Sequence, residues 1–229
     1  MTYSGKTKEV GRHGELLLLR FTDRVLGRNG MPDAGGNCVV GSEPGRGARC
    51  RAMARWTFAV LAAAGLPTHF RGELPAGLLV EPCARIPLEV IVRNAARGSF
   101  IARYGSHIAP GTPLPGLVEL TLKDDAADDP LLTPEAAIAL GLATAAELAD
   151  IDRLARAANA ALRAAFAAYK MIPDDFKLEF GRSAAGSLMI IDELGINSMR
   201  LSRNGALLSA AELADWLATV TPSHTKPTA

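Results

Sequence analysis

Short apolar runs bounded by glycine dominate the first third of the chain. The runs at residues 15–21 and 78–80 each predict a buried strand. Between them, glycine and proline gather over residues 33–47, which predicts a long loop. A helix is predicted from near Cys50 to Ala64, because Gly65 directly after it can cap its C-terminus.

The middle and end of the chain contain further strand patterns. The β-branched run at residues 87–94 predicts a strand, and residues 118–122 predict another. Residues 176–180 and 188–191 predict two strands of a hairpin that turns through Gly186.

Three helix starts are visible in the second half. Thr133 followed by Pro134 offers an N-cap with proline in the first turn. Thr144 and Glu147 form a capping box, which opens a long Ala/Leu helix to about Lys170. Ser209 and Glu212 repeat the capping pattern before a last helix.

This order of elements predicts an α+β fold with two lobes. A small β-rich lobe would cover residues 1–84, and a larger mixed lobe would cover residues 85–229, with the boundary near residues 82–87. We expect the ligand in the cleft between the lobes, since such clefts are common binding sites.

Composition narrows the classes of function. The 229 residues include 25 Lys and Arg and 24 Asp and Glu, so the net charge is +1, and nucleic acid is not an expected partner. We find neither a secretory signal nor an apolar run of membrane-spanning length, so no membrane association is expected. The three cysteines form no CxxC pair, and the cytoplasm is the simplest location.

Two lysines close to the N-terminus are candidate phosphate ligands. In an extended chain, Lys6 and Lys8 lie on one face, and Gly5 beside them lets backbone approach an anion. The pair suits a triphosphate, although the segment is not a Walker A loop. The alternative is a solvated terminus.

Charged and apolar residues alternate from Asp175 to Phe180. In a strand, Asp175, Lys177 and Glu179 point one way, while the intervening residues point into the core. The three charges indicate a site; the alternative is the solvated side of a strand.

Asp192 and Glu193 end the second strand of this hairpin. If the strands pair, Asp192 comes near Glu179, and two close carboxylates repel unless a cation or a proton lies between them. Mg²⁺ is commonly held by one or two carboxylates together with substrate phosphates. The alternative is an ordinary turn at a strand end.

A fourth candidate follows the strand at residues 87–94. Arg93 ends it, and Gly98 and Ser99 begin the next element, so that a guanidinium, a hydroxyl and backbone N–H groups could converge on an anion. The alternative is a capped helix start with Arg93 in a salt bridge.

Taken together, these segments resemble the SAICAR synthetase (phosphoribosylaminoimidazole-succinocarboxamide synthase) family of purine biosynthesis. The resemblance rests on segments that occur in family order: YSGKTKEV at 3–10, GLPTH at 65–69, PLEVIVRNAARGSF at 87–100, LKDDAADDP at 122–130, DFKLEFG at 175–181, and DE at 192–193 with Arg200 and Leu201 after it.

The resemblance implies a fold and a reaction. It implies a nucleotide lobe at the N-terminus, ATP between the lobes, and Mg²⁺ as a cofactor. The implied enzyme is an ATP-dependent carboxylate–amine ligase, which joins the amine of aspartate to the carboxylate of carboxyaminoimidazole ribonucleotide through an acyl phosphate. A homo-oligomer is compatible with the family.

The resemblance also implies roles for residues of this chain. Lys6 and Lys8 would hold ATP phosphates, Lys123 would lie by the nucleotide, and the backbone at Arg85 and Ile86 would meet adenine. Glu179 and Asp192 would hold Mg²⁺. Arg93, Ser99 and Arg200 would bind the ribonucleotide phosphate. Asp175 and Lys177 would lie against the reacting carboxylate, where Lys177 can offset developing charge.

The chain departs from the family pattern over residues 23–51 and 195–202. The first stretch includes residues 23–30, which stand where the family has a DxTSAxxG-like loop. Where the family reads Ser-Pro-Asp after DE, this chain has residues 195–197, ending in Asn197; where it reads Gly-Lys-Gly and then Asn-Asn, this chain has Arg46 and then Cys50 and Arg51. Three alternatives stay open: a divergent purine enzyme, a paralogue that uses another amino acid or heterocycle, such as the pyrazole of a C-nucleoside antibiotic, and a non-catalytic ATP-binding module.

Overall fold

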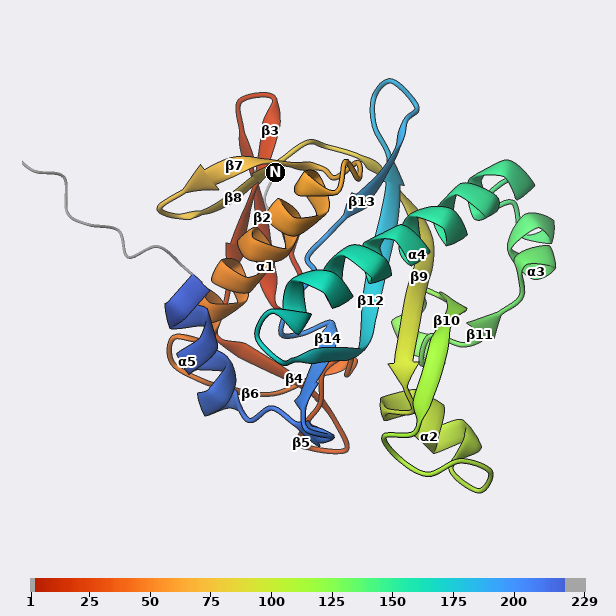
Figure 1. Ribbon diagram of the computed structural model, residues 1–229. Helices are drawn as coiled ribbons and strands as arrows, with labels where there is room; N and C mark the ends of the chain where they lie inside the picture. The colour runs from red at the N-terminus through yellow and green to blue at the C-terminus, as the bar shows by residue number, and fades with distance from the viewer. Residues whose placement is uncertain (1–2, 221–229) are drawn as a thin grey trace, which may run out of the picture.

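The computed structural model of the protein describes residues 3–220. Its first sheet has five antiparallel strands in the order β1-β2-β3-β8-β7 (Figure 1). The apolar runs expected to be strands are β3 and β8, which pair with each other. The strands are β1 (Tyr3–Ser4), β2 (Lys8–His13), β3 (Leu16–Phe21), β7 (Phe70–Leu74) and β8 (Gly77–Val80).

A second, three-stranded sheet corrects the loop predicted at residues 33–47. Its strands are β4 (Arg24–Arg28), β5 (Met31–Pro32) and β6 (Cys38–Ser42), in the order β5-β4-β6. β6 falls inside the predicted loop, because β4 supplies backbone partners for a segment whose own composition indicates a loop.

The helix predicted from near Cys50 begins earlier, as α1 (Arg46–Ala63). Its start is fixed by Asp23, whose carboxylate accepts hydrogen bonds from the N–H groups of Gly45 (3.1 Å) and Gly47 (2.8 Å). Because this capping residue lies more than twenty positions earlier in the chain, the local sequence did not reveal the start.

The third sheet is the largest and carries most of the candidate site. Its order is β11-β10-β9-β12-β14-β15, and β13 also pairs with β12 as the predicted hairpin. The strands are β9 (Ala84–Ala95), β10 (Pro113–Leu122), β11 (Leu131–Leu132), β12 (Ile172–Arg182), β13 (Leu188–Ile191), β14 (Met199–Arg203) and β15 (Ala206–Leu207).

The helices of the second half begin where the sequence predicted. Thr133 caps α3, and the capping boxes at Thr144 and Ser209 are both formed. The long helix ends slightly before the predicted Lys170, at Ala167. The remaining elements are α2 (Gly98–Tyr104), the short 3₁₀ helix η1 (Asp125–Ala127), α3 (Pro134–Ala139), α4 (Ala145–Ala167) and α5 (Ala210–Val220).

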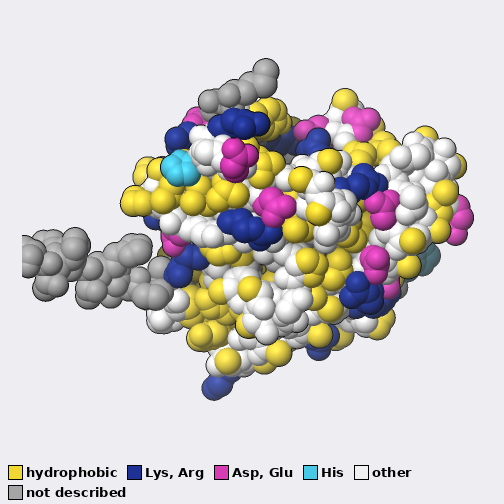
Figure 2. Space-filling model, turned by 90° about the horizontal axis from the view of Figure 1, so that it is seen from above, with side chains coloured by type: hydrophobic (Ala, Val, Ile, Leu, Met, Phe, Trp, Pro, Cys, Tyr) yellow, Lys and Arg dark blue, Asp and Glu magenta, His cyan; other side chains and the backbone are white. Residues whose placement is uncertain are grey.

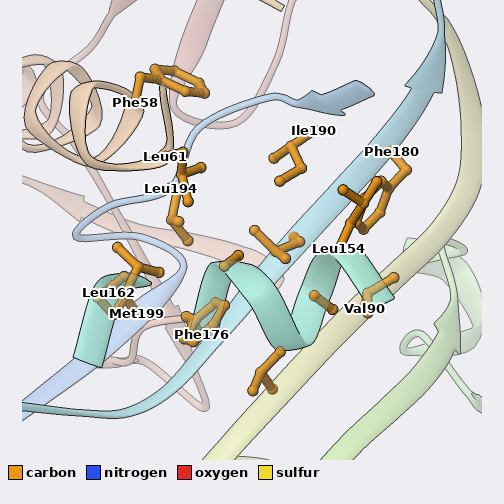
Figure 3. Close-up of a cluster of buried hydrophobic side chains, with 14 of the residues drawn as sticks. Phe58, Leu61, Val90, Leu154, Leu162, Phe176, Phe180, Ile190, Leu194 and Met199 are labelled. Carbon is orange, nitrogen blue, oxygen red and sulfur yellow. The ribbon is translucent and has the colours of Figure 1, made fainter. Parts of the chain in front are cut away.

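One apolar core joins the helices to the sheets. α4 packs on β9, β10 and β12, while α1 contacts α4 and α5 as well as β3 and β8 (Figure 1). Figure 3 shows side chains of this core, including Phe58, Leu61, Val90, Leu154, Leu162, Phe176, Phe180, Ile190, Leu194 and Met199. Burial of these side chains fixes which face of β9 and β12 turns away from α4.

The mixture of sheets and helices confirms the predicted α+β class. The division at residues 84 and 85 stays a prediction; β9 begins at Ala84. On the face shown in Figure 2, basic and acidic side chains are interspersed and form no patch of one sign. No helix within residues 3–220 combines the length and the apolar character needed to cross a membrane.

Candidate active site

β12 carries its charged and apolar residues on opposite faces, as predicted. Phe176, Leu178 and Phe180 are each about 1% exposed and belong to the core. Lys177 and Glu179 line a cavity on the other face, and Asp175 and Lys177 line a second cavity. Lys177 therefore borders both cavities, which we call the nucleotide-side cavity and the acceptor-side cavity.

Lys177 is held by Glu89, a carboxylate that was not among the predicted site residues. Its Nζ donates to Glu89 Oε1 at 2.6 Å, and Lys123 Nζ donates to the same oxygen at 2.9 Å. Lys123 also pairs with Glu179 at 3.0 Å. Burial acts to raise the pKa of Glu89, but the two lysines outweigh it and lower this pKa.

A signal for Glu89 was present in the chain. Glu89 lies in the predicted strand at residues 87–94, two residues from Ile91 and four from Arg93, so that period-2 geometry places all three on one face. The register of the sheet then puts Glu89 directly opposite Glu179. Pairing of β9 with β12 was the missing information.

The predicted approach of Asp192 to Glu179 follows from the hairpin. Glu179 pairs with Ile191, and Asp192 is the next residue. Burial raises the pKa of Glu179, and the nearby charge of Asp192 raises it further. For Asp192, burial also acts upward, but the ammonium group of Lys8, 2.8 Å from Oδ1, lowers the pKa below its ordinary value.

Backbone geometry at Asp192 is unusual and is supported by a histidine. Asp192 has φ of 66°, in the left-handed region that aspartate tolerates better than most residues. His69 Nε2 lies 3.0 Å from the Asp192 carbonyl oxygen, and since a carbonyl only accepts, the Nε2 nitrogen carries the proton. Burial lowers the pKa of His69 to about 4, so the ring is neutral.

Glu179 and Asp192 fit a hard divalent cation. Both carboxylates line the nucleotide-side cavity. The raised pKa of Glu179 shows that its negative charge is unfavourable there, and a bound cation would stabilise that charge. No group of three or more candidate ligands occurs within residues 3–220. Two carboxylates with further oxygens from a substrate phosphate are a common arrangement for Mg²⁺.

The two N-terminal lysines line the same cavity, but the chain between them is not extended. A turn separates β1 from β2, closed by the Gly5 N–H donating to the Lys8 carbonyl oxygen at 2.8 Å. Lys8 is buried against Asp192, whereas Lys6 pairs with Asp125 at 2.7 Å. The expectation of an extended chain was therefore wrong, because this turn rather than strand alternation brings both lysines to one cavity.

The residues expected to meet adenine lie at the start of β9. Arg85 is exposed and lines the nucleotide-side cavity, while Ile86 is fully buried in the core. Their contact with a base stays a prediction.

Arg93, Ser99 and Arg200 converge on the acceptor-side cavity. Arg93 Nη2 donates to Ser99 Oγ at 2.8 Å, and Arg93 Nη1 donates to Asp175 Oδ2 at 3.1 Å. Arg200 Nη1 donates to the same carboxylate oxygen at 2.8 Å. Arg93 also pairs with Glu119, so the salt-bridge alternative describes its present contacts; anion binding stays a prediction.

Three of the departures from the family pattern lie in contact with one another. Arg46 Nη2 donates to Asn197 Oδ1 at 3.0 Å, and Asn197 Nδ2 lies 3.4 Å from Cys50 Sγ and 3.3 Å from Glu193 Oε1. Cys50 is about 1% exposed, and burial raises its pKa to about 12, which makes a nucleophilic role inconsistent with its surroundings. Asn197 lines the nucleotide-side cavity.

A family model described as SAICAR synthetase matches residues 1–210. The chain belongs to the SAICAR synthetase family. A phosphoribosylaminoimidazole-succinocarboxamide synthase of Listeria monocytogenes is 35% identical over 205 residues, covering 88% of this chain and 83% of that protein. The enzyme of the same name from Deinococcus deserti is 37% identical over 205 residues, covering 87% of this chain and 82% of that protein.

Solved structures agree with the family assignment. A SAICAR synthetase in complex with ADP superposes with a TM-score of 0.81 at 29% identity, covering 90% of this chain and 87% of the other. The synthase from Ehrlichia chaffeensis gives a TM-score of 0.81 at 26% identity, covering 95% and 92%. The resemblance drawn from the sequence is confirmed, and this member of the SAICAR synthetase family is an enzyme of the ligase class, in purine biosynthesis.

Proposed function

We propose that the chain uses ATP and Mg²⁺ to join the amine of aspartate to the carboxylate of carboxyaminoimidazole ribonucleotide, giving SAICAR, ADP and phosphate. The observation that carries this proposal is the position of Lys177. It borders both cavities, with Glu179 and Asp192 on one side and Asp175, Arg93 and Arg200 on the other. A carboxylate bound in the acceptor-side cavity and a nucleotide bound in the other cavity would both lie beside this residue.

The chemistry needs a phosphoryl transfer followed by an amine attack. An oxygen of the substrate carboxylate attacks the γ-phosphorus, and the bond to the ADP oxygen breaks. The amine nitrogen then attacks the acyl carbon, phosphate leaves with its oxygen, and the nitrogen loses a proton. The first step brings the negatively charged carboxylate and the phosphates together. The enzyme therefore accelerates it mainly by positioning the reactants and by neutralising their charge.

Residues of this chain would serve these steps as follows. Lys6, Lys8 and Lys123 would bind phosphates of ATP, and Asp125 would have to release Lys6 for this. Lys177 would stabilise charge on the reacting carboxylate, held in place by Glu89. Mg²⁺ bound by Glu179 and Asp192 would neutralise phosphate charge.

The acceptor-side cavity would hold the ribonucleotide phosphate. The two guanidinium groups of Arg93 and Arg200 share the carboxylate of Asp175 and leave further N–H groups beside Ser99. The named relatives support the purine substrate.

The proposal keeps the cytoplasm as the place of the reaction. ATP is available there, and a reducing environment suits the three free thiols, Cys38, Cys50 and Cys83.

An omission experiment tests the proposed reaction. ADP release is measured with Mg-ATP, carboxyaminoimidazole ribonucleotide and aspartate, and again with each component left out. We expect release only with the complete mixture, together with a product of SAICAR mass. ATP binding without release in any mixture would instead support a non-catalytic module, and release with another amino acid would support a paralogue.

A further inference from the structure

Lys8 forms ion pairs with two consecutive carboxylates, which differ in how far they are buried. Its Nζ lies 2.8 Å from Asp192 Oδ1 and 2.9 Å from Glu193 Oε1. Both residues line the nucleotide-side cavity, but the side chain of Asp192 is 33% exposed and that of Glu193 is 3% exposed. One ammonium group is therefore paired with a partly exposed carboxylate and with a buried one.

Glu193 is bonded by three donors of the chain itself. Its Oε1 receives bonds from Lys8, from Thr7 Oγ1 at 3.3 Å and from Asn197 Nδ2 at 3.3 Å. Its Oε2 is buried without a hydrogen-bond partner.

Burying such a carboxylate is costly unless a positive charge accompanies it. Asn197 contributes an N–H rather than a charge, and Arg46 bonds to the amide oxygen of Asn197 rather than to Glu193. Lys8 is therefore the only cation within hydrogen-bonding distance of Glu193 among the described residues. This dependence works in both directions, so Glu193 also fixes where the ammonium group can lie.

We propose that Glu193 is a positioning residue for Lys8, which keeps the ammonium group at the nucleotide phosphates once Asp192 is engaged by the metal. The inference rests on the proposed function, because it takes Lys8 as a phosphate ligand and Asp192 as a metal ligand.

The reason is electrostatic. A divalent cation bound to Asp192 would offset the negative charge of that carboxylate and repel the nearby ammonium group of Lys8. One of the two carboxylates that hold Lys8 then interacts with it more weakly, while the buried carboxylate of Glu193 keeps its bond. Without the metal, Asp192 alone can hold Lys8 in place. The contribution of Glu193 should therefore depend on the presence of Mg²⁺.

The test measures binding of AMP-PNP, a non-hydrolysable ATP analogue, to the full chain by calorimetry, with excess Mg²⁺ and with EDTA. For Glu193→Gln, we expect about tenfold weaker binding with Mg²⁺, the size of a lost charge-assisted hydrogen bond, and less than twofold in EDTA. Glu73→Gln is the matched control, because Glu73 also lies between two cations, Arg51 and Arg55, but lines neither cavity.

A second pair of variants separates positioning from general damage. In a Lys8→Met background, adding Glu193→Gln should cause no further loss of binding. If Glu193→Gln does not fold, Glu193→Asp carries the same comparison, since it keeps the charge but withdraws it from Lys8 by one methylene.

The outcomes are distinct. An equal loss with Mg²⁺ and in EDTA, no loss at all, or a loss that persists without Lys8 overturns the inference. A wild-type chain that binds no AMP-PNP overturns both the inference and the proposed function. A wild-type chain that binds AMP-PNP but makes no SAICAR overturns the proposed function alone.

Discussion

Lys177 and Glu89 form an ion pair at the boundary between the two cavities. Lys177 could be predicted from the alternation of charged and apolar residues along its strand, because an isolated strand fixes which side chains share a face. Glu89 could not be assigned to it, since period-2 spacing says nothing about which strand lies alongside. The same limit applies to Glu193 and Lys8, which are far apart in the sequence and meet only after the chain folds.

Replacing Lys177 tests the catalytic pair. Lys177→Met should lower kcat by about 10²–10³-fold, the usual cost of removing a group that stabilises developing charge. The fold should persist, because Glu89 keeps its bond to Lys123. Steady-state kinetics and thermal unfolding check this, with the exposed Lys170→Met as control; a kcat close to the wild-type value would remove Lys177 from the mechanism.

Replacing Asp192 tests the metal site. Asp192→Asn keeps the shape of the side chain but halves the carboxylate charge that Glu179 and Asp192 offer together. We expect the Mg²⁺ concentration for half-maximal activity to rise about tenfold or more. Titration of activity with Mg²⁺ measures this, with Asp150→Asn on the exposed face of α4 for comparison. An unchanged Mg²⁺ requirement would exclude Asp192 as a ligand.

At the scale of elements, local signals worked where the stabilising contacts are local. The capping residues Thr133, Thr144 and Ser209 each bond within three positions, and all three helix starts were predicted correctly. α1 and β6 were misjudged because their partners, Asp23 and β4, are distant in the sequence. A local sequence pattern therefore predicts an element only where neighbouring residues determine its ends.

α1 also holds the turn that carries Asp192 and Glu193. Thr57 is fully buried, and its hydroxyl donates to the Leu194 carbonyl oxygen at 2.6 Å. Thr57→Val keeps the size but leaves that carbonyl unpaired, which should lower the free energy of unfolding by about 1–3 kcal/mol. Urea denaturation measures the loss.

Thr219→Val is the control for this prediction. The hydroxyl of Thr219 bonds the Trp216 carbonyl oxygen within the same helix, three residues away, so no turn depends on it. Equal stabilities for the wild type and the Thr57 variant would mean that α1 does not anchor the turn through this bond.

At the scale of the whole molecule, the sheets bring distant segments of the chain to two cavities that share one lysine. The order of the predicted elements indicated the class of the fold. All residues named from the family resemblance except Ile86 line one of the two cavities, whereas Glu89 was missed. The order of strands, with β9 between β10 and β12, was not readable because pairing depends on contacts between segments far apart.

Stability should fall in mild acid because of His69. Its pKa is about 4 in the folded chain and near 6.5 when unfolded, so the unfolded state binds an extra proton between these values. The stabilisation is complete above pH 6.5 and is lost as the pH falls towards 4. From pH 6.5 to 5 the free energy of unfolding should drop by about 1.5 kcal/mol from this group.

The variant His69→Gln removes this titration and should make the pH profile flatter over the same range. Urea denaturation at several pH values compares it with the wild type and with His107→Gln, a change at an exposed histidine. A profile for His69→Gln as steep as that of the wild type would assign the acid sensitivity to other groups.

The most direct test of the account follows an oxygen atom. Carboxyaminoimidazole ribonucleotide labelled with ¹⁸O in its carboxylate is turned over with Mg-ATP and aspartate, and the phosphate released is examined by mass spectrometry. If the γ-phosphate of ATP is transferred to the carboxylate beside Lys177 before the amine attacks, each released phosphate carries one labelled oxygen. Phosphate without label, formed together with SAICAR, would contradict the acyl phosphate route.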